Sequence, residues 1–95
     1  MFGPNSPGLT EYFRKKAAWE KASSVTGRDP NFVRVDDYGS TIYWDEYGNR
    51  NSAFGWEIDH KLPSALGGSD SVGNLRALHW RNNAALGGQL AALMR

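Results

Sequence analysis

The chain contains no cysteine, which limits how a small fold can be held together. Disulfides, a thiol nucleophile and any zinc or iron–sulfur site with cysteine ligands are excluded. A chain of 95 residues is also too short to divide into two domains that each bury a sufficient core. The sequence therefore predicts one domain stabilised by packing, for which four Trp, four Tyr and four Phe can supply the core.

Charge and hydropathy narrow the classes of partner. Eleven Lys and Arg against ten Asp and Glu leave a net charge of +1 at pH 7, too little for a polyanion-binding tail or a membrane-surface helix. Affinity for nucleic acid would have to come from local clustering of basic side chains. No apolar run approaches the roughly 18 residues of a membrane span, and no signal-peptide pattern opens the chain. We therefore expect a cytoplasmic protein with no membrane partner, and protein partners are left open.

The first part of the chain predicts an N-terminal helix. Residues 1–8 carry two Pro and two Gly, which predicts a flexible arm leading to a helix N-cap near Thr10. Residues 11–22 contain no Gly or Pro, so we expect the helix there. Its expected apolar stripe consists of Leu9, Tyr12, Phe13, Ala17 and Trp19.

A β-hairpin should follow this helix. Residues 32–35 and 41–44 are β-rich runs, and the residues at 37–40 between them are typical of a turn. Together with the helices and strands described next, the hairpin predicts a single α+β domain over residues 9–95.

The second part of the chain predicts a strand, a long loop, a strand and a helix. In residues 54–60 the apolar residues alternate with polar ones, so a strand should carry Asp59 and His60 to its end. Residues 61–73 form an expected loop, long for so small a domain and therefore typical of a functional segment. A short strand at 75–78 precedes the predicted helix. We expect this helix from Trp80 to Leu86, a break at Gly87-Gly88, and a terminal helical turn or two in residues 89–94.

The stretch from Trp56 to Asn83 carries a specific arrangement of residues. It contains Asp59-His60, Pro63, Gly67-Gly68, Asn74-Leu75 and Asn83. Single pieces such as Asp-His are common by chance, but this order is far more specific, with 14 positions from His60 to Asn74 and nine from Asn74 to Asn83. The stretch resembles the HNH nuclease motif, whose core is a ββα-metal unit. The resemblance covers residues 56–87, and the helix and hairpin before them fit a family whose flanking parts vary.

This resemblance implies a metal-dependent endonuclease that hydrolyses phosphodiester bonds of DNA. His60 is then the general base, Asp59 and Asn83 ligate one divalent cation, and Asn74 braces the loop. An imidazole suits the base because its unperturbed pKa, about 6.5, lies near working pH. One carboxylate oxygen and one amide oxygen make a hard, sparse site, which favours Mg²⁺ or Mn²⁺ over tightly held zinc.

Each of these residues also has a simpler interpretation. Taken alone, His60 could be an ordinary hydrogen-bonded histidine and Asp59 a turn-capping carboxylate. Asn74 is structural on either account, as an anchor of the loop. Asn82 competes with Asn83 for the ligand role, and the nine-residue interval favours Asn83.

Six more residues are secondary candidates. Lys61, Arg76, Arg81 and Arg28 are candidate phosphate contacts, or else they only make the surface soluble. Glu57 precedes Asp59 by two residues and is a candidate outer contact of the site, although a solvated carboxylate is the simpler interpretation. His79 is a candidate second base, ligand or outer contact, and we favour a structural role because it lies before the helix.

Two departures from the family pattern affect the interpretation. Many relatives hold a zinc ion with two Cys-x-x-Cys pairs, and here Ser23 with Thr26 and His79 with Asn82 have that pair spacing. We therefore expect hydrogen bonds in place of the clamp and no structural zinc. Leu86-Gly87 stands where relatives often have Lys-Gly, which removes one expected phosphate contact.

Two alternatives to an active nuclease follow. The first is a catalytically weak or inactive module on the same fold that binds nucleic acid or a protein partner, favoured by the near-neutral charge and the missing lysine. The second is a small β-rich interaction domain whose aromatic residues are all core, which would bind no metal.

Overall fold

Helix α1, Pro7–Trp19, opens the computed structural model, which describes residues 7–93. Proline is favoured at the first helical position because its ring presets φ and its missing N–H has no partner there. The expected N-cap at Thr10 is therefore wrong, since Thr10 lies inside the helix, and the helix ends three residues before Ala22. Of the predicted flexible arm, residues 1–6 lie outside the described residues, and Pro7 and Gly8 belong to α1.

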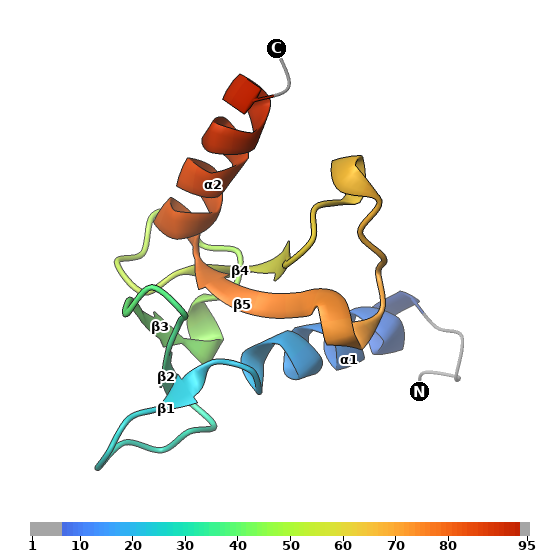
Figure 1. Ribbon diagram of the computed structural model, residues 1–95. Helices are drawn as coiled ribbons and strands as arrows, with labels where there is room; N and C mark the ends of the chain where they lie inside the picture. Colours follow the sequence, from blue (N-terminus) through green and yellow to red (C-terminus); the bar gives the residue numbers. More distant parts are fainter. Residues whose placement is uncertain (1–6, 94–95) are drawn as a thin grey trace.

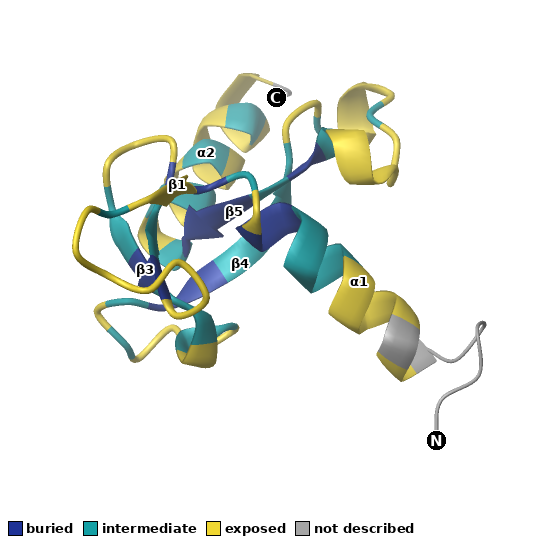
Figure 2. Cartoon of the chain, turned by 90° about the horizontal axis from the view of Figure 1, so that it is seen from below, coloured by how far each residue is buried: buried dark blue, intermediate teal, exposed yellow. Residues whose placement is uncertain are grey.

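The buried part of α1 is its C-terminal end. Ala18 and Trp19 are buried, whereas Tyr12 and Phe13 of the expected stripe are 48% and 58% exposed. Figure 2 shows the same change along the helix, from yellow in its N-terminal half to dark blue where it meets the sheet. The expected stripe is wrong for Tyr12 and Phe13, because helical periodicity identifies an apolar face but not how far along it the core extends.

The predicted hairpin is confirmed. Strands β2, Val33–Val35, and β3, Thr41–Tyr43, pair antiparallel, and β1, Ser23–Ser24, adds an edge strand to β2. The carboxylate of Asp36 closes the turn: its Oδ1 accepts backbone N–H bonds from Tyr38 and Ser40 at 3.0 and 2.9 Å. The first short 3-10 helix, Trp44–Glu46, follows β3.

The ββα unit occupies the second half of the chain. Strands β4, Trp56–His60, and β5, Leu75–His79, pair antiparallel with Asp59 opposite Arg76 and His60 opposite Leu75. Two 3-10 helices, Ser64–Leu66 and Val72–Asn74, lie in the connection between them. Helix α2, Trp80–Leu93, follows β5 directly, and α1 and α2 lie on opposite sides of the β4–β5 sheet (Figure 1).

The expected helix break at Gly87-Gly88 is wrong, because α2 is continuous through both residues. Glycine in a helix interior costs about 1 kcal/mol relative to alanine, which weakens a helix without ending it. Glycine ends a helix when it adopts a positive φ. Within residues 7–93 the glycines with positive φ are Gly27, Gly39, Gly48 and Gly67.

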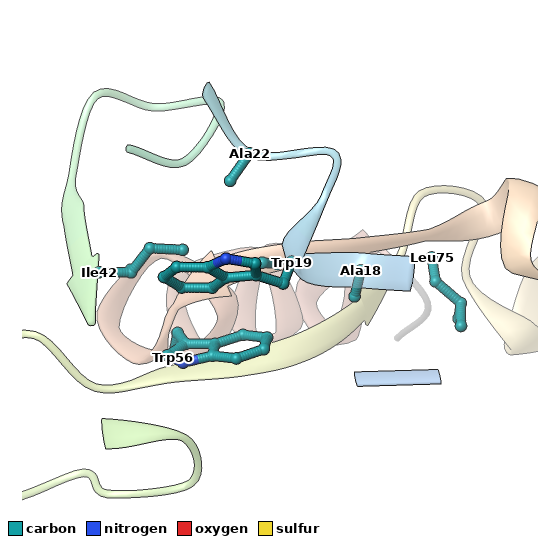
Figure 3. Packing of buried hydrophobic residues seen from close by; sticks show 7 residues of the cluster. Ala18, Trp19, Ala22, Ile42, Trp56 and Leu75 are labelled. Carbon is teal, nitrogen blue, oxygen red and sulfur yellow. The ribbon is translucent and has the colours of Figure 1, made fainter. Parts of the chain in front are cut away.

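Indole rings form the centre of the core. Trp19 of α1 and Trp56 of β4 lie with ring centroids 5.1 Å apart, and Ile42 of β3 packs beside them (Figure 3). Each buried indole N–H has a partner, since Nε1 of Trp19 donates to the Pro30 carbonyl and Nε1 of Trp56 to the Trp44 carbonyl. The core thus joins α1, the hairpin and the ββα unit, which confirms a single small α+β domain. Neither described helix is long and apolar enough to cross a membrane.

Candidate functional site

The loop between β4 and β5 is fixed by Asn74. Its Oδ1 accepts from the Leu62 backbone N–H at 2.8 Å, and its Nδ2 donates to the carbonyls of Leu62 and Ser69 at 3.0 and 2.7 Å. The backbone N–H of Lys61 also donates to the Asn74 carbonyl at 2.8 Å. Asn74 therefore ties the start of the loop to its end and holds the end of β4, where Asp59 and His60 lie.

Two glycines allow the loop to turn back on itself. Gly67 has φ +89°, a backbone conformation that side chains rarely permit. A Cβ added at Gly68 would lie 1.7 Å from the Leu62 carbonyl oxygen, so only glycine fits there. Steric constraints thus explain why both positions are glycine. At Gly68 the loop packs against Leu62, the residue that Asn74 also holds.

A cavity of about 430 Å³ lies between the end of β4, the loop and α2. Asp59 and His60, the last two residues of β4, both line this cavity. Asn83 of α2 lines it as well. The remaining wall is largely apolar and consists of Ile58, Lys61, Pro63, Ser64, Arg76, Leu86, Gly87, Gln89, Leu90 and Leu93.

Asp59 is held by an ion pair. Nε of Arg76 donates to its Oδ2 at 2.8 Å, and NH1 of Arg76 reaches Asp37 at 3.2 Å. Only 16% of the Asp59 side chain is exposed. The other oxygen, Oδ1, accepts no hydrogen bond from the described residues, so one carboxylate oxygen is available to a ligand in the cavity.

Asn83 is oriented by Glu57. Its Nδ2 donates to Glu57 Oε1 at 2.8 Å, and because a carboxylate only accepts, the amide oxygen of Asn83 must point away from Glu57. Arg50 in turn donates two bonds of 2.7 Å to Glu57. The Arg50 bond is the main reason why the pKa of Glu57 lies below its usual value; burial opposes this, and Asn83 adds to it. Glu57 is thus held by Arg50 and by Asn83, which lines the cavity, and is not a freely solvated carboxylate.

His60 contacts a carboxylate that the sequence patterns did not indicate. Its Nε2 lies 2.9 Å from Oδ1 of Asp70, in the loop. NH2 of Arg14 donates to the same oxygen at 2.8 Å, which connects the site to α1. Neither Arg14 nor Asp70 belongs to the sequence motif. The two residues are 56 positions apart, so no local sequence pattern could predict their contact.

The four candidate phosphate contacts lie in different environments. Lys61 lines the cavity and is exposed, and Arg76 lines it but is engaged by Asp59 and Asp37. Arg81 stacks over the Trp80 ring at 5.0 Å, and Arg28 lies 5.9 Å from the Tyr43 ring. Neither Arg81 nor Arg28 lines the cavity. Of the four, Lys61 is therefore the basic residue at the cavity without an ion pair among the described residues.

His79 is structural. It is 5% exposed, its Nε2 lies 2.8 Å from the Ala53 carbonyl, and its Nδ1 accepts the backbone N–H of Arg81 at 3.1 Å. Since one ring nitrogen must accept and the other must donate, both bonds are satisfied by neutral imidazole with its proton on Nε2. His79 does not line the cavity that contains His60, so it is not placed to act as a second base there.

The hydrogen bonds that replace the clamp reach His79 and Asn82 from backbone and from Asp36. No hydrogen bond among the described residues joins Ser23 or Thr26 to them, and His79 contacts a backbone carbonyl as one of the expected alternatives. Oδ2 of Asp36 accepts the His79 backbone N–H at 2.9 Å and Nδ2 of Asn82 at 2.8 Å. Asp36 precedes Gly39 by three residues, a spacing typical of a turn, so the sequence could have indicated its place in the hairpin turn but not its contact with His79 and Asn82.

No group of three or more His, Asp or Glu side chains within residues 7–93 is arranged to hold a metal ion. A cation at this site would therefore rely on two protein oxygens, from Asp59 and Asn83, together with water and phosphate oxygens. Comparison with protein-family models, curated proteins and solved structures found no match to this chain.

Proposed function

We propose that the protein is a metal-dependent endonuclease of the HNH type that hydrolyses DNA. The observation that carries this proposal is the shared cavity: a histidine, a carboxylate with one available oxygen and an amide oriented by Glu57 line one space. These residues come from both ends of the ββα unit. Asp59 and His60 lie in β4, Asn74 ends the loop, and Asn83 lies in α2.

The donor set fits a hard divalent cation. Asp59 Oδ1 and the Asn83 amide oxygen are both oxygen donors without hydrogen-bond partners among the described residues. Such ligands suit Mg²⁺ or Mn²⁺, which keep several positions for water and substrate. When bound, the cation would neutralise the negative charge that develops on the phosphate and the departing oxygen.

His60 supplies the base in this proposal. Its unprotonated nitrogen accepts a proton from water as the water oxygen attacks phosphorus, and the bond from phosphorus to the 3′ oxygen breaks. The departing 3′ oxygen takes a proton from solvent, so the products carry a 5′-phosphate and a 3′-hydroxyl. Lys61, exposed at the cavity, is placed to contact a neighbouring phosphate.

Plasmid DNA tests the proposal. The purified protein is incubated with supercoiled plasmid and Mg²⁺, Mn²⁺ or EDTA, and the nicked and linear forms are separated on a gel. Nicking with a divalent cation and none with EDTA is the expected result. No nicking with any divalent cation would contradict the proposal. Retained DNA binding in that case would favour the inactive binding module, in which Arg76 keeps Asp59 paired.

The two ligand residues should differ in their contribution to Mn²⁺ binding. Asp59→Ala should weaken binding more than Asn83→Ala, because a carboxylate attracts the cation by charge and an amide only by its dipole. Binding is measured by electron paramagnetic resonance of Mn²⁺, with thermal melting as the check of folding. Asp45→Ala, an exposed carboxylate outside the cavity, is the matched control. Wild-type Mn²⁺ binding by both cavity variants would refute the ligand assignment.

A further inference from the structure

The loop residue Asp70 connects His60 to α1. Its Oδ1 lies 2.9 Å from Nε2 of His60 and accepts from NH2 of Arg14 at 2.8 Å. Asp70 is 67% exposed, whereas the side chains of His60 and Arg14 are 27% and 28% exposed. Ion pairs of exposed carboxylates are usually weak. Contacts from both His60 and Arg14 to Oδ1 of Asp70 therefore indicate that the surrounding structure holds Asp70 in place.

The backbone next to Asp70 is fixed by the loop brace. Nδ2 of Asn74 donates to the carbonyl of Ser69 at 2.7 Å, and the Ser69 and Ser71 hydroxyls lie 2.9 Å apart across Asp70. Asn74 thus holds both the end of β4 that carries His60 and the segment that carries Asp70.

Arg14 is fixed from the other side. NH1 of Arg14 donates to Glu11 Oε2 at 3.3 Å, and the Tyr47 hydroxyl donates to Glu11 Oε1 at 2.8 Å. Burial and the Glu11 hydrogen bond raise the pKa of Tyr47 to about 12, so this phenol keeps its proton at neutral pH. A continuous series of hydrogen bonds therefore runs from Tyr47 through Glu11, Arg14 and Asp70 to His60.

We infer that Asp70 is a positioning residue for His60: its carboxylate accepts a hydrogen bond from Nε2–H, which fixes the ring and leaves the imidazole lone pair on Nδ1, and Arg14 holds Asp70 in place. The inference rests on the proposed function, because it assigns the nitrogen that acts as the base. A carboxylate can only accept, so while the contact lasts the neutral ring must carry its proton on Nε2. Carboxylates commonly orient functional histidines in this way.

The charge state of Asp70 agrees with this role. The His60 hydrogen bond, together with the nearby charge of Arg14, keeps the pKa of Asp70 below its ordinary value. Asp70 therefore stays an acceptor at neutral pH.

Imidazole nitrogen spectra test the inference without reference to cleavage. The ¹⁵N-labelled protein is studied at about pH 8.5, well above the usual pKa of imidazole. In the wild type, His60 should show an Nε2–H proton protected from exchange with solvent. In Asp70→Ala this proton should exchange too fast to be seen. Asp70→Asn, which keeps an acceptor oxygen, should retain the signal in part, and Arg14→Ala should weaken it.

His79 provides an internal control in every spectrum. Its Nε2–H bond to Ala53 and its Nδ1 bond from Arg81 do not involve Asp70, so its signals should be the same in all variants. His60 signals in Asp70→Ala that match the wild type would overturn the inference. Loss of the His79 signals in Asp70→Ala would show a folding defect. The His60 Nε2–H signals of Asp70→Asn and Arg14→Ala would then decide whether Asp70 positions His60.

Kinetics give a second readout. Asp70→Ala should lower kcat roughly 10- to 100-fold with little change in KM, because the base is misplaced while phosphate contacts remain. Asp45→Ala should behave as the wild type. An unchanged kcat in Asp70→Ala would also contradict the inference. If the wild type does not cleave DNA at all, the proposed function fails, and the spectra alone decide whether Asp70 positions His60.

Discussion

His60→Ala should reduce metal-dependent plasmid cleavage by roughly 10²- to 10⁴-fold, the usual loss when a general base is removed. His60 is the histidine that lines the cavity with Asp59 and Asn83, and the other histidine is buried elsewhere. Without the imidazole, water must attack phosphorus without a base. The measurement is the initial rate of nicking at a saturating Mg²⁺ or Mn²⁺ concentration.

The substitution should leave folding and metal binding nearly unchanged, because the His60 side chain lies outside the core and is not among the proposed ligands. His60→Ala purified by the same procedure also controls for contaminating nucleases, since a contaminant would cleave in both preparations. Cleavage by His60→Ala at the wild-type rate would exclude His60 as the base.

Asp36→Asn should lower the free energy of unfolding by roughly 2 to 4 kcal/mol, although the two side chains have almost the same shape. Asp36 is 4% exposed, and its two oxygens accept four N–H bonds. An asparagine places an NH₂ group where one oxygen was, so two N–H donors lose their acceptor whichever way the amide turns. Each unsatisfied buried donor costs about 1–3 kcal/mol.

Thermal melting measures this loss at roughly 4–8 °C per kcal/mol for a domain of this size. Asp37→Asn is the matched control, since the neighbouring carboxylate is 51% exposed and makes a single contact of 3.2 Å to Arg76. Its effect should stay below about 1 kcal/mol. Equal melting temperatures for the two variants would show that Asp36 does not hold the hairpin to the ββα unit.

The order of strands and helices could be predicted from sequence because each depends on local patterns. Alternating apolar residues identified β4, and turn residues identified the hairpin. The resemblance to the HNH motif supplied the site residues, and the structure places His60, Asp59 and Asn83 at one cavity. The predicted helix break at Gly87-Gly88 is wrong, because the low helix propensity of glycine only destabilises a helix and does not prevent it from forming.

The contacts around the site could not be predicted in this way. Arg14 lies 56 positions from Asp70, and Asp36 lies 46 positions from Asn82. Periodicity compares residues within a few turns of one another and carries no signal for such pairs. They depend on how the core places α1 and the hairpin against the ββα unit. The structure was needed to show that Arg76 is paired and that Glu57 orients Asn83.

The two walls of the cavity differ in what keeps them folded. Asp59 and His60 belong to a strand pair packed on the aromatic core, so their positions depend on the stability of the whole domain. The opposite wall is the second half of α2, which contains no buried residue and includes Gly87 and Gly88. Those two glycines cost about 2 kcal/mol together relative to alanine, and little packing compensates for them. The cavity can therefore widen by local unwinding of the second half of α2, while Asp59 and His60 stay in register on the strands and Asn83, in the first turn of α2, keeps its bond to Glu57.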